Sequence, residues 1–488
     1  NAYDAAVAVG FALAVVLPRA GNIGGGGFMV MHDAPSNESY SIDYREKAPL
    51  KASRDMYLNE DGSVNTSRST IGYLAIGVPG TVYGMWEVHK KFGSMSWEEL
   101  LQPAIELADS GFEMSPYMTM TLNRFHRKLS QFKETESIFY KEHPIKFNTS
   151  LVQPDLAQTL RLIAQKGVAG FYEGEVADKI VSAMEKNGGL ISHRDLKKYR
   201  PSWRKPLKSK YRGFDVVTMG PPSSGGIHLI QMLNILENHD LKAFGHNNPR
   251  YVSLLTEVMK YAYADRSEYL GDPDFYKVPV DELTSKEYSK AINQKLKLFE
   301  FMTPPPTPSS SIEPGEYMRK ESIETTHYSI ADQYGNIISN TYTLNSSYGS
   351  GVTIEGTGIL MNNEMDDFSA SPGTPNQFGL LGGEANKIVP EKRPLSSMTP
   401  TIILKEGTPY FATGTPGGSR IITSVLQSIL NIIDFELEVS DAILKPRIHH
   451  QWYPDILQLE KSFNSLHAET LKKNCLLYTS DAADDTLC

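Results

Sequence analysis

Residues Thr325–Leu344 have the sequence TTHYSIADQYGNIISNTYTL. Two runs of alternating polarity, 326–332 and 337–344, flank the turn-forming Tyr334-Gly335-Asn336, and this arrangement predicts a β-hairpin. The segment before it, Thr303 to Glu316, holds five prolines and a run of serines, a composition that predicts a linker that does not pack and stays mobile. Thr325 therefore stands at the start of a strand, directly after a linker.

A threonine at such a boundary suggests a residue that becomes an N-terminus. Its hydroxyl needs a base to act as a nucleophile, and the free α-amine of the same residue, with a pKa of ~7.7 to 8.0, is one established base. Cleavage between Glu324 and Thr325 would create that amine, because an internal threonine has only an amide nitrogen. The alternative is that Thr325 and Thr326 are ordinary β-forming residues, which strand propensity alone favours.

The rest of the chain alternates helical and strand-like segments. Ser96 and Glu99 form a capping box at the start of one helix. The other predicted helices cover 5–16, 156–165, 175–186, 227–237, 249–263, 285–296 and 419–433, and the other strands 28–31, 41–44, 400–404 and 410–413. This mixture predicts a layered α+β fold.

Composition excludes several function classes. The 488 residues are 40% hydrophobic and 22% charged, with a formal net charge of -9, so no basic footprint for nucleic acid is present. The apolar run at 5–16 is shorter than the ~20 residues that span a bilayer. Both cysteines, Cys475 and Cys488, lie near the end of the chain, which excludes a disulfide framework.

Four clusters carry candidate chemistry. The hydroxyls of 341–345 close the hairpin and are expected beside Thr325. The acidic turn 363–368 is the second cluster, although a solvated surface is the favoured explanation of such a run on its own. Residues 393–398 place two hydroxyls before a strand, and paired glycines in 415–420 open a helix, where backbone N–H groups can bind a phosphate or a developing oxyanion.

Two other features point away from chemistry. His449-His450 has no nearby set of metal ligands, so a packed or surface pair is the favoured interpretation. The glycine run Gly24–Gly27 precedes a strand and not a helix, which favours tight packing over phosphate binding.

Taken together, five ordered motifs closely resemble the γ-glutamyltransferases, also called glutathione hydrolases. They are Thr325–Ser329, Tyr342–Asn345, Met365–Ser369, Arg393–Met398 and Gly417–Arg420. The likeness continues through Asp43–Glu46, Pro221–Gly226 and Tyr261–Arg266, and covers the chain from Asn1 to about Glu460. The resemblance implies an N-terminal nucleophile hydrolase with a four-layer αββα sandwich, made as one precursor that cuts itself.

The same resemblance implies a role for each site residue. Thr325 would open the small subunit and attack the γ-glutamyl carbonyl, with Thr343 orienting its hydroxyl. The remaining residues would hold the oxyanion through backbone N–H groups (Gly417 and Gly418), bind the substrate α-carboxylate (Arg45, Ser396 and Ser397), and receive its α-ammonium (Asn345, Glu364 and Asp367). With this assignment the acidic turn is interpreted as a site and no longer as a solvated surface.

The implied partners are glutathione and other γ-glutamyl compounds, with water or an amino acid or dipeptide as acceptor and no metal or organic cofactor. Residues 1–324, with a mobile linker at 303–324, would form the large subunit, and 325–474 the small catalytic subunit of a heterodimer. The family's usual setting is periplasmic or extracellular. Because Asn1 is not a methionine, a signal segment is expected to be absent from this chain.

Two departures from the family stand out. Pro372 to Gly383, with Asn376 and Phe378, fills the interval of a pocket lid, but Phe378 lacks the phenol or indole that many members carry there. The tail 475–488 matches nothing in the pattern, so we expect it to be non-native, attached to a C-terminally truncated small subunit. Two alternatives stay open: a related amide hydrolase that acts on a cephalosporin-type acyl group or a γ-linked polyglutamate, or a non-catalytic binding protein that never matures.

Overall fold

The computed structural model describes residues 1–300, 303–312, 325–371, 373–473 and 478–479. The chain forms two compact units that each combine segments from both sides of Thr325. The first unit comprises 1–205, 324–370 and 388–394, and the second 206–323, 371–387 and 395–488. Neither predicted subunit therefore corresponds to one compact unit.

The first unit is built on a five-stranded antiparallel sheet with the order β5-β2-β1-β9-β8. The strands are β1 (Gly26–Asp33), β2 (Glu38–Asp43), β5 (Ser202–Arg204), β8 (Thr326–Ala331) and β9 (Ile337–Thr343). The predicted hairpin is confirmed as β8 and β9. Its turn is held by Asp332 Oδ1, which accepts the N–H groups of Tyr334 at 2.9 Å and Asn336 at 3.0 Å.

The two faces of this sheet differ in chemistry. One face contributes Met29, Met31, Ile338 and Tyr342 to an apolar core with helices of the same unit. Alternation along the strands places Ser339, Thr341 and Thr343 of β9 on the other face. The hydroxyl-bearing face is therefore the one opposite the helices.

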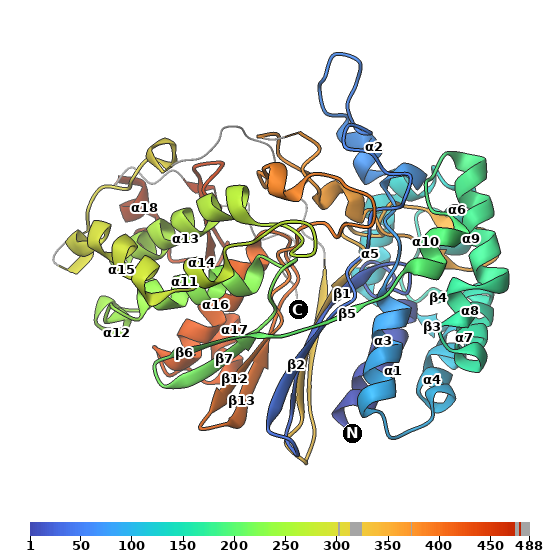
Figure 1. Cartoon of the computed structure of the whole chain (residues 1–488), viewed down its shortest axis with the longest axis horizontal. Helices are drawn as coiled ribbons and strands as arrows, with labels where there is room; N and C mark the ends of the chain where they lie inside the picture. The colour runs from blue at the N-terminus through green and yellow to red at the C-terminus, as the bar shows by residue number, and fades with distance from the viewer. Residues whose placement is uncertain (301–302, 313–324, 372, 474–477, 480–488) are drawn as a thin grey trace. The chain divides into compact units, whose positions relative to one another are not determined.

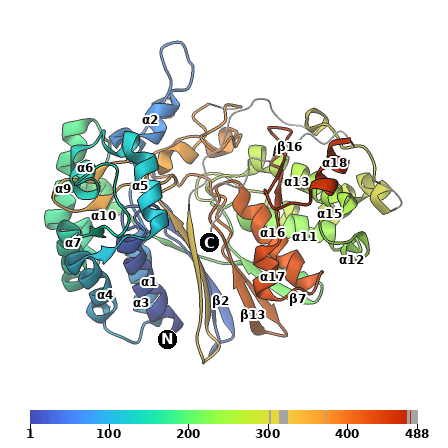
Figure 2. The same cartoon turned by 180° about the vertical axis from the view of Figure 1, so that it is seen from behind.

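Helices cover the apolar face of the first sheet. Nearest are α1 (Ala2–Val16) and α3 (Thr81–Phe92), followed by α4 (Trp97–Ser110) and α7 (Pro154–Lys166) (Figures 1 and 2). The predicted capping box is confirmed, because the Ser96 hydroxyl accepts the Glu99 N–H and the Glu99 carboxylate accepts the Ser96 N–H. The remaining elements of this unit are α2 (Thr66–Thr70), η1 (Tyr73–Ala75), β3 (Phe112–Glu113), α5 (Pro116–Leu129), α6 (Lys133–Phe139), β4 (Ser150–Leu151), α8 (Ala169–Tyr172), α9 (Gly174–Asn187), α10 (His193–Lys198), β10 (Thr353–Ile354), β11 (Ile359–Leu360) and η4 (Glu364–Asp367).

The glycine run before β1 is a packing feature, as predicted. A Cβ atom on Gly25 would lie 2.1 Å from the carbonyl oxygen of Thr343, and one on Gly24 would lie 2.1 Å from that of Leu360. These contacts are with backbone atoms, which cannot move aside. The absence of side chains thus lets the chain entering β1 lie directly against the end of β9.

The second unit has its own antiparallel sheet, with the order β13-β12-β7-β6. Its strands are β6 (Leu207–Tyr211), β7 (Phe214–Thr218), β12 (Thr401–Lys405) and β13 (Thr408–Thr413). The central helix α11 (Gly225–Leu236) packs against β6 and against α13 (Pro249–Tyr269), α15 (Lys286–Lys295) and α16 (Arg420–Ile433). The remaining elements are α12 (Leu241–Phe244), α14 (Val280–Leu283), η2 (Lys297–Glu300), η3 (Ser309–Ser311), η5 (Glu384–Asn386), α17 (Val439–Leu444), β14 (Ile448–His449), β15 (Leu457–Leu459), α18 (Ser465–Lys473) and β16 (Tyr478–Thr479).

Residues 303–312 of the predicted mobile linker are packed within the second unit. Lys260 Nζ donates to the Thr307 carbonyl at 2.7 Å, and Trp452 Nε1 donates to the carbonyls of Ser309 at 3.0 Å and Ile312 at 2.7 Å. Prolines lack an N–H, so side-chain donors that satisfy the carbonyls are enough to hold this backbone. The remainder of the predicted linker, 313–324, lies outside the described residues.

Two further observations concern membrane-spanning helices and the predicted non-native tail. None of the helices in the described ranges is long and apolar enough to cross a membrane. Most of the predicted non-native tail lies outside the described residues, but Tyr478–Thr479 form β16, which pairs in parallel with β15. The origin of the tail stays a prediction.

Candidate active site

The predicted nucleophile lies opposite its predicted partner in the first sheet. The register pairs Thr326 with Tyr342, so continuing it by one residue sets Thr325 across from Thr343. Directly opposed residues project from the same face of an antiparallel pair. Thr325 is 8% exposed, and Thr343 Oγ1 accepts the Asn345 N–H at 2.9 Å, which leaves its own proton available for donation.

His327 is a residue of this strand to which the sequence assigned no role. Its ring Nδ1 lies 2.8 Å from the Thr341 hydroxyl and Nε2 lies 2.9 Å from the Ser329 hydroxyl. The ring therefore connects hydroxyls of both hairpin strands on the face that carries Thr325. Its position within the Thr325–Ser329 motif was the only signal for it.

The acidic turn is buried, which supports a site over a solvated surface. Residues 364–367 form the 3₁₀ helix η4, in which positions i and i+3 project on the same side. Glu364 and Asp367 are such a pair and both bind Arg45, whereas Met365 and Phe368 enter the apolar cluster around Tyr57.

Arg45 is the centre of this charged cluster. Its Nη1 contacts Glu364 Oε1, its Nη2 lies 2.5 Å from Asp367 Oδ2, and its Nε donates to the Pro394 carbonyl at 3.2 Å. Burial by itself would lower the pKa of Arg45, but the charges of Glu364, Asp367 and Glu46 raise it. Arg45, predicted to bind the substrate α-carboxylate, is thus ion-paired with Glu364 and Asp367, which are predicted to bind the α-ammonium.

Glu46 adds a third carboxyl group that sequence reasoning missed as a site residue. Within the described residues, neither of its oxygens has a hydrogen-bond partner, and its carboxyl group lies beside that of Glu364. Neighbouring buried carboxyl groups do not both ionise, so this pair holds one proton between them. Burial raises the pKa of Glu46 to about 7 and the pKa of Glu364 well above its usual range, although the Arg45 charge lowers both.

This shared proton makes stability depend on pH. The folded-state pKa of Glu46, about 7, lies above its ordinary 4.5, so its contribution to stability is complete below that ordinary value and is lost as the pH rises through 7. Glu46→Gln stays uncharged, and its amide can donate to Glu364. We expect the melting temperature of Glu46→Gln, relative to the unchanged chain, to be higher at about pH 8 than at about pH 5.

Thermal unfolding monitored by circular dichroism at both pH values measures this difference. Glu60→Gln is the control, because Glu60 is exposed and its substitution is expected to have the same small effect at both. An equal effect of Glu46→Gln at the two pH values would contradict the shared proton.

Asn345 links the hairpin to the acidic turn. It adopts a left-handed conformation with a φ of 77°, which asparagine tolerates better than most residues. Its Nδ2 donates to the Asn363 carbonyl at 3.0 Å, one residue before Glu364. A strand register, hydrogen bonds and ion pairs therefore connect the six predicted site residues of the first unit: Arg45, Thr325, Thr343, Asn345, Glu364 and Asp367.

The paired serines belong to the second unit, where they meet an upstream motif. The backbone of Ser396 bridges to Ser223, and the Ser396 carbonyl accepts the Ser224 hydroxyl at 2.8 Å. Arg266 joins both pairs, because its Nε donates to Ser224 Oγ at 3.0 Å and its Nη2 to Ser397 Oγ at 3.2 Å. Arg266 is a third functional candidate without a sequence-based role, after His327 and Glu46, although it ends the Tyr261–Arg266 motif.

The predicted oxyanion turn has the backbone that its glycines permit. Gly417 has a φ of 139° and Gly418 a φ of 54°, both in the region that favours glycine. Among the described residues, neither amide N–H is hydrogen-bonded to an acceptor. Ser419 follows as the N-cap residue of α16, and its carbonyl accepts the Tyr263 hydroxyl.

The predicted lid residues also belong to the second unit. Asn376 Oδ1 accepts the N–H groups of Phe378 at 3.0 Å and Leu380 at 3.2 Å, which closes a tight turn. Phe378 is buried. Pro372, the first residue of the predicted lid, lies outside the described residues, as does Glu324 of the predicted cleavage site.

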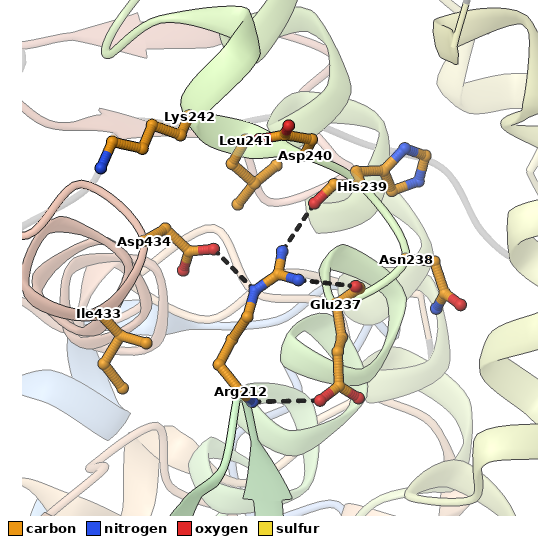
Figure 3. Close-up of a pocket in the computed structure, with 9 residues that line it drawn as sticks. All are labelled: Arg212, Glu237, Asn238, His239, Asp240, Leu241, Lys242, Ile433 and Asp434. Atoms are coloured by element: carbon orange, nitrogen blue, oxygen red, sulfur yellow. Dashed lines mark hydrogen bonds and ion pairs between the residues drawn. The ribbon is translucent and has the colours of Figure 1, made fainter.

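One pocket of the second unit, of about 370 Å³, is separate from every predicted site residue (Figure 3). Arg212 is at its centre, with Nε 3.0 Å from Asp434 Oδ1, Nη1 donating to the Glu237 carbonyl at 3.0 Å and Nη2 to the His239 carbonyl at 2.6 Å. Each of the three guanidinium nitrogens thus makes a contact that ties these segments together. The pocket thus offers a ligand no free cation at its centre.

The histidine pair is packed, as predicted. His449 and His450 are both buried; His449 Nδ1 lies 2.8 Å from Thr423 Oγ1, and His450 Nε2 lies 3.1 Å from Asp455 Oδ1. No group of three metal-ligating side chains occurs in the part of the chain that the structure describes.

The chain matches the family described as Gamma-glutamyltranspeptidase over residues 1–481. The match passes the limit near Glu460 that the motifs predicted, and it includes the first residues of the predicted tail. The "Glutathione hydrolase proenzyme" of Escherichia coli K12 is 48% identical over 474 residues, which are 97% of this chain and 80% of that protein.

Solved structures agree with this relationship. Helicobacter pylori gamma-glutamyltranspeptidase is 47% identical, with a TM-score of 0.62, over 64% of this chain and 89% of its own. A cephalosporin acylase from Bacillus halodurans is 25% identical, with a TM-score of 0.85, over 98% of this chain and 84% of its own. Since both a family-wide match and near-half identity extend over almost all its residues, the chain belongs to the Gamma-glutamyltranspeptidase family.

Proposed function

We propose that this proenzyme cuts itself between Glu324 and Thr325 and then transfers γ-glutamyl groups from glutathione and related compounds. The chain is an enzyme of γ-glutamyl transfer and hydrolysis, as its family membership and its likeness to glutathione hydrolase proenzymes indicate. The processed precursor would contain a large subunit, 1–324, and a small subunit that begins at Thr325.

The proposed reaction uses the new α-amine of Thr325 as the base. The amine takes the hydroxyl proton as Oγ attacks the γ-carbonyl, and Gly417 and Gly418 donate their N–H groups to the oxyanion. Collapse breaks the C–N bond, the proton passes to the leaving amine, and a γ-glutamyl ester on Thr325 remains. Water or the amino group of an amino acid or dipeptide then attacks the ester and restores the hydroxyl.

The buried cluster around Arg45 is the observation that carries the substrate assignment. With one proton shared between Glu46 and Glu364, Arg45 and the three carboxyl groups carry about one net negative charge. A zwitterion can enter this cluster at no change in charge: its α-carboxylate replaces a carboxylate on Arg45, and its α-ammonium pairs with Glu364 and Asp367. We assign Asn345 to the ammonium and Ser396 and Ser397 to the carboxylate on the same basis.

The layers of the fold, the lid and the cellular location are three further proposals. The largest sheet of each unit has helices packed against it, which supports the four-layer αββα sandwich implied by the resemblance. The loop with Asn376 and Phe378 is proposed as the lid over the acyl-enzyme. A periplasmic or extracellular location is proposed from the family's usual setting, and cell fractionation of the source organism tests it.

The alternative activity is that of an acylase, favoured by the likeness to a cephalosporin acylase. An apolar or dicarboxylic acyl group has no α-ammonium, so it would leave Glu364 and Asp367 without a ligand partner. We therefore expect release of p-nitroaniline from γ-glutamyl-p-nitroanilide to exceed acylase turnover of a glutaryl-cephalosporin by at least about a hundred-fold in kcat/KM. The reverse order would replace the γ-glutamyl assignment with the acylase.

A further inference from the structure

Behind the Gly417–Gly418 turn lies a buried amide that the proposed mechanism does not use. Gln451 follows β14 and is 4% exposed. Its Oε1 accepts the Ser419 hydroxyl at 2.7 Å and lies 2.9 Å from His449 Nε2. Its Nε2 donates to the Phe378 carbonyl at 3.3 Å.

The orientation of this amide is determined by its neighbours. Phe378 offers a carbonyl, which requires the NH₂ end, so the oxygen end faces Ser419 and His449. Burial holds the pKa of His449 well below its usual range, so the ring is neutral. Its Nε2–H then donates to Gln451, and Nδ1 lies 2.8 Å from the Thr423 hydroxyl.

Ser419 is consequently held at two points. Its hydroxyl is bound by Gln451 and its carbonyl by the Tyr263 hydroxyl. Ser419 directly follows Gly418 in the chain. Because glycines have little conformational preference of their own, the direction of the Gly417 and Gly418 N–H groups depends on how the next residue is anchored.

We propose that Gln451 is a positioning residue that aims the Gly417–Gly418 turn and couples it to the loop carrying Phe378. This role rests on the proposed functions of that turn and that loop. One end of a single planar amide contacts Ser419, directly after the turn, and the other end contacts the Phe378 carbonyl in the loop, so displacement of the loop removes a restraint on the turn. Gln451 thereby makes oxyanion stabilisation depend on the position of the loop over the acyl-enzyme.

Only an amide of this length supplies an acceptor at one end and a donor at the other. Gln451→Met has similar volume and loses both, whereas Gln451→Glu keeps the acceptor and loses the donor. The matched control is Thr423→Val, which removes the hydroxyl bound to His449 in the same buried network and leaves the contacts of Gln451 in place.

The test uses the mature enzyme and two readouts. Single-turnover release of p-nitroaniline from γ-glutamyl-p-nitroanilide measures acylation, and the ratio of glutamate to γ-glutamyl-glycylglycine at fixed glycylglycine measures the fate of the acyl-enzyme. For Gln451→Met we expect acylation to slow about ten-fold, less than the hundred-fold or more for loss of a donor, and the product ratio to shift about three-fold.

The other variants separate the two ends of the amide. Gln451→Glu is expected to acylate within about two-fold of the unchanged enzyme and to shift the product ratio as much as Gln451→Met, while Thr423→Val changes neither readout by more than about two-fold. If Gln451→Met does not mature, Ser419→Ala, which removes only the hydroxyl at the oxygen end, is expected to slow acylation and leave the product ratio unchanged.

Two outcomes overturn this role. If Gln451→Met acylates within two-fold of the unchanged enzyme, Gln451 does not position the turn. If Thr423→Val slows acylation as much as Gln451→Met does, the effect comes from general packing of the buried network and not from Gln451. An unchanged enzyme that releases no p-nitroaniline would instead refute the proposed function itself, so the two failures are distinguishable.

Discussion

Replacing Thr325 with alanine is expected to leave the precursor uncut and to reduce γ-glutamyl turnover by at least about 10⁴-fold. Alanine removes the hydroxyl proposed to attack the peptide bond before it, so the α-amine proposed as the catalytic base would not form. The register of β8 and β9, continued by one residue, sets Thr325 opposite Thr343. Denaturing electrophoresis after incubation, with the anilide assay on the same sample, measures both effects.

Two controls make this result specific. Thr325→Ser keeps a hydroxyl and should still be cut, with reduced turnover. Ser329→Ala removes a hydroxyl from the same strand and face, and it is expected to be cut and to turn over within about two-fold of the unchanged chain. Two fragments from Thr325→Ala would refute the nucleophile assignment, and a single uncut band from the unchanged chain would favour a non-maturing binding protein.

Replacing Arg45 with methionine is the second change with a large expected effect. It leaves Glu46, Glu364 and Asp367 buried without their shared cation, and breaking a buried ion pair in this way costs ~3–5 kcal/mol of stability. It also removes the donors proposed for the substrate α-carboxylate. We expect a lower melting temperature and a fall in kcat/KM of at least about a thousand-fold.

Arg45→Lys separates charge from geometry. An ammonium keeps the cation, but it cannot contact Glu364, Asp367 and the Pro394 carbonyl with a planar fork. We expect stability close to that of the unchanged chain and the loss of most discrimination between γ-glutamyl-p-nitroanilide and 4-aminobutanoyl-p-nitroanilide, which lacks the α-carboxylate. The ratio of kcat/KM for the two anilides measures this.

The control for Arg45 is Arg204→Met. Arg204 Nε lies 2.8 Å from Asp43 Oδ2 in the same sheet, so its loss should lower stability without changing the ratio of the two substrates. Undiminished discrimination in Arg45→Lys would contradict a role for Arg45 in binding the α-carboxylate.

Local patterns predicted much of the secondary structure. The hairpin of β8 and β9, the capping box at Ser96 and the helix after Gly417–Gly418 depend on neighbouring residues, and all are present. The β6–β7 hairpin was missed, because Lys208 and Lys210 occupy alternate positions of β6 and weaken its apolar pattern. The packing of 303–312 was also missed, since Lys260 and Trp452 are far away in the sequence.

The sequence by itself determined the family and predicted a nucleophile and the residue types of a site, because short motifs with local chemistry carry this information. The tertiary structure decided how those residues are paired: Arg45 with Glu364 and Asp367, Glu46 with Glu364, and Gln451 with both Ser419 and Phe378. These contacts join segments that are distant in the chain. Their energetics depend on desolvation, since a carboxyl group retains a proton near neutral pH only when folding removes it from water.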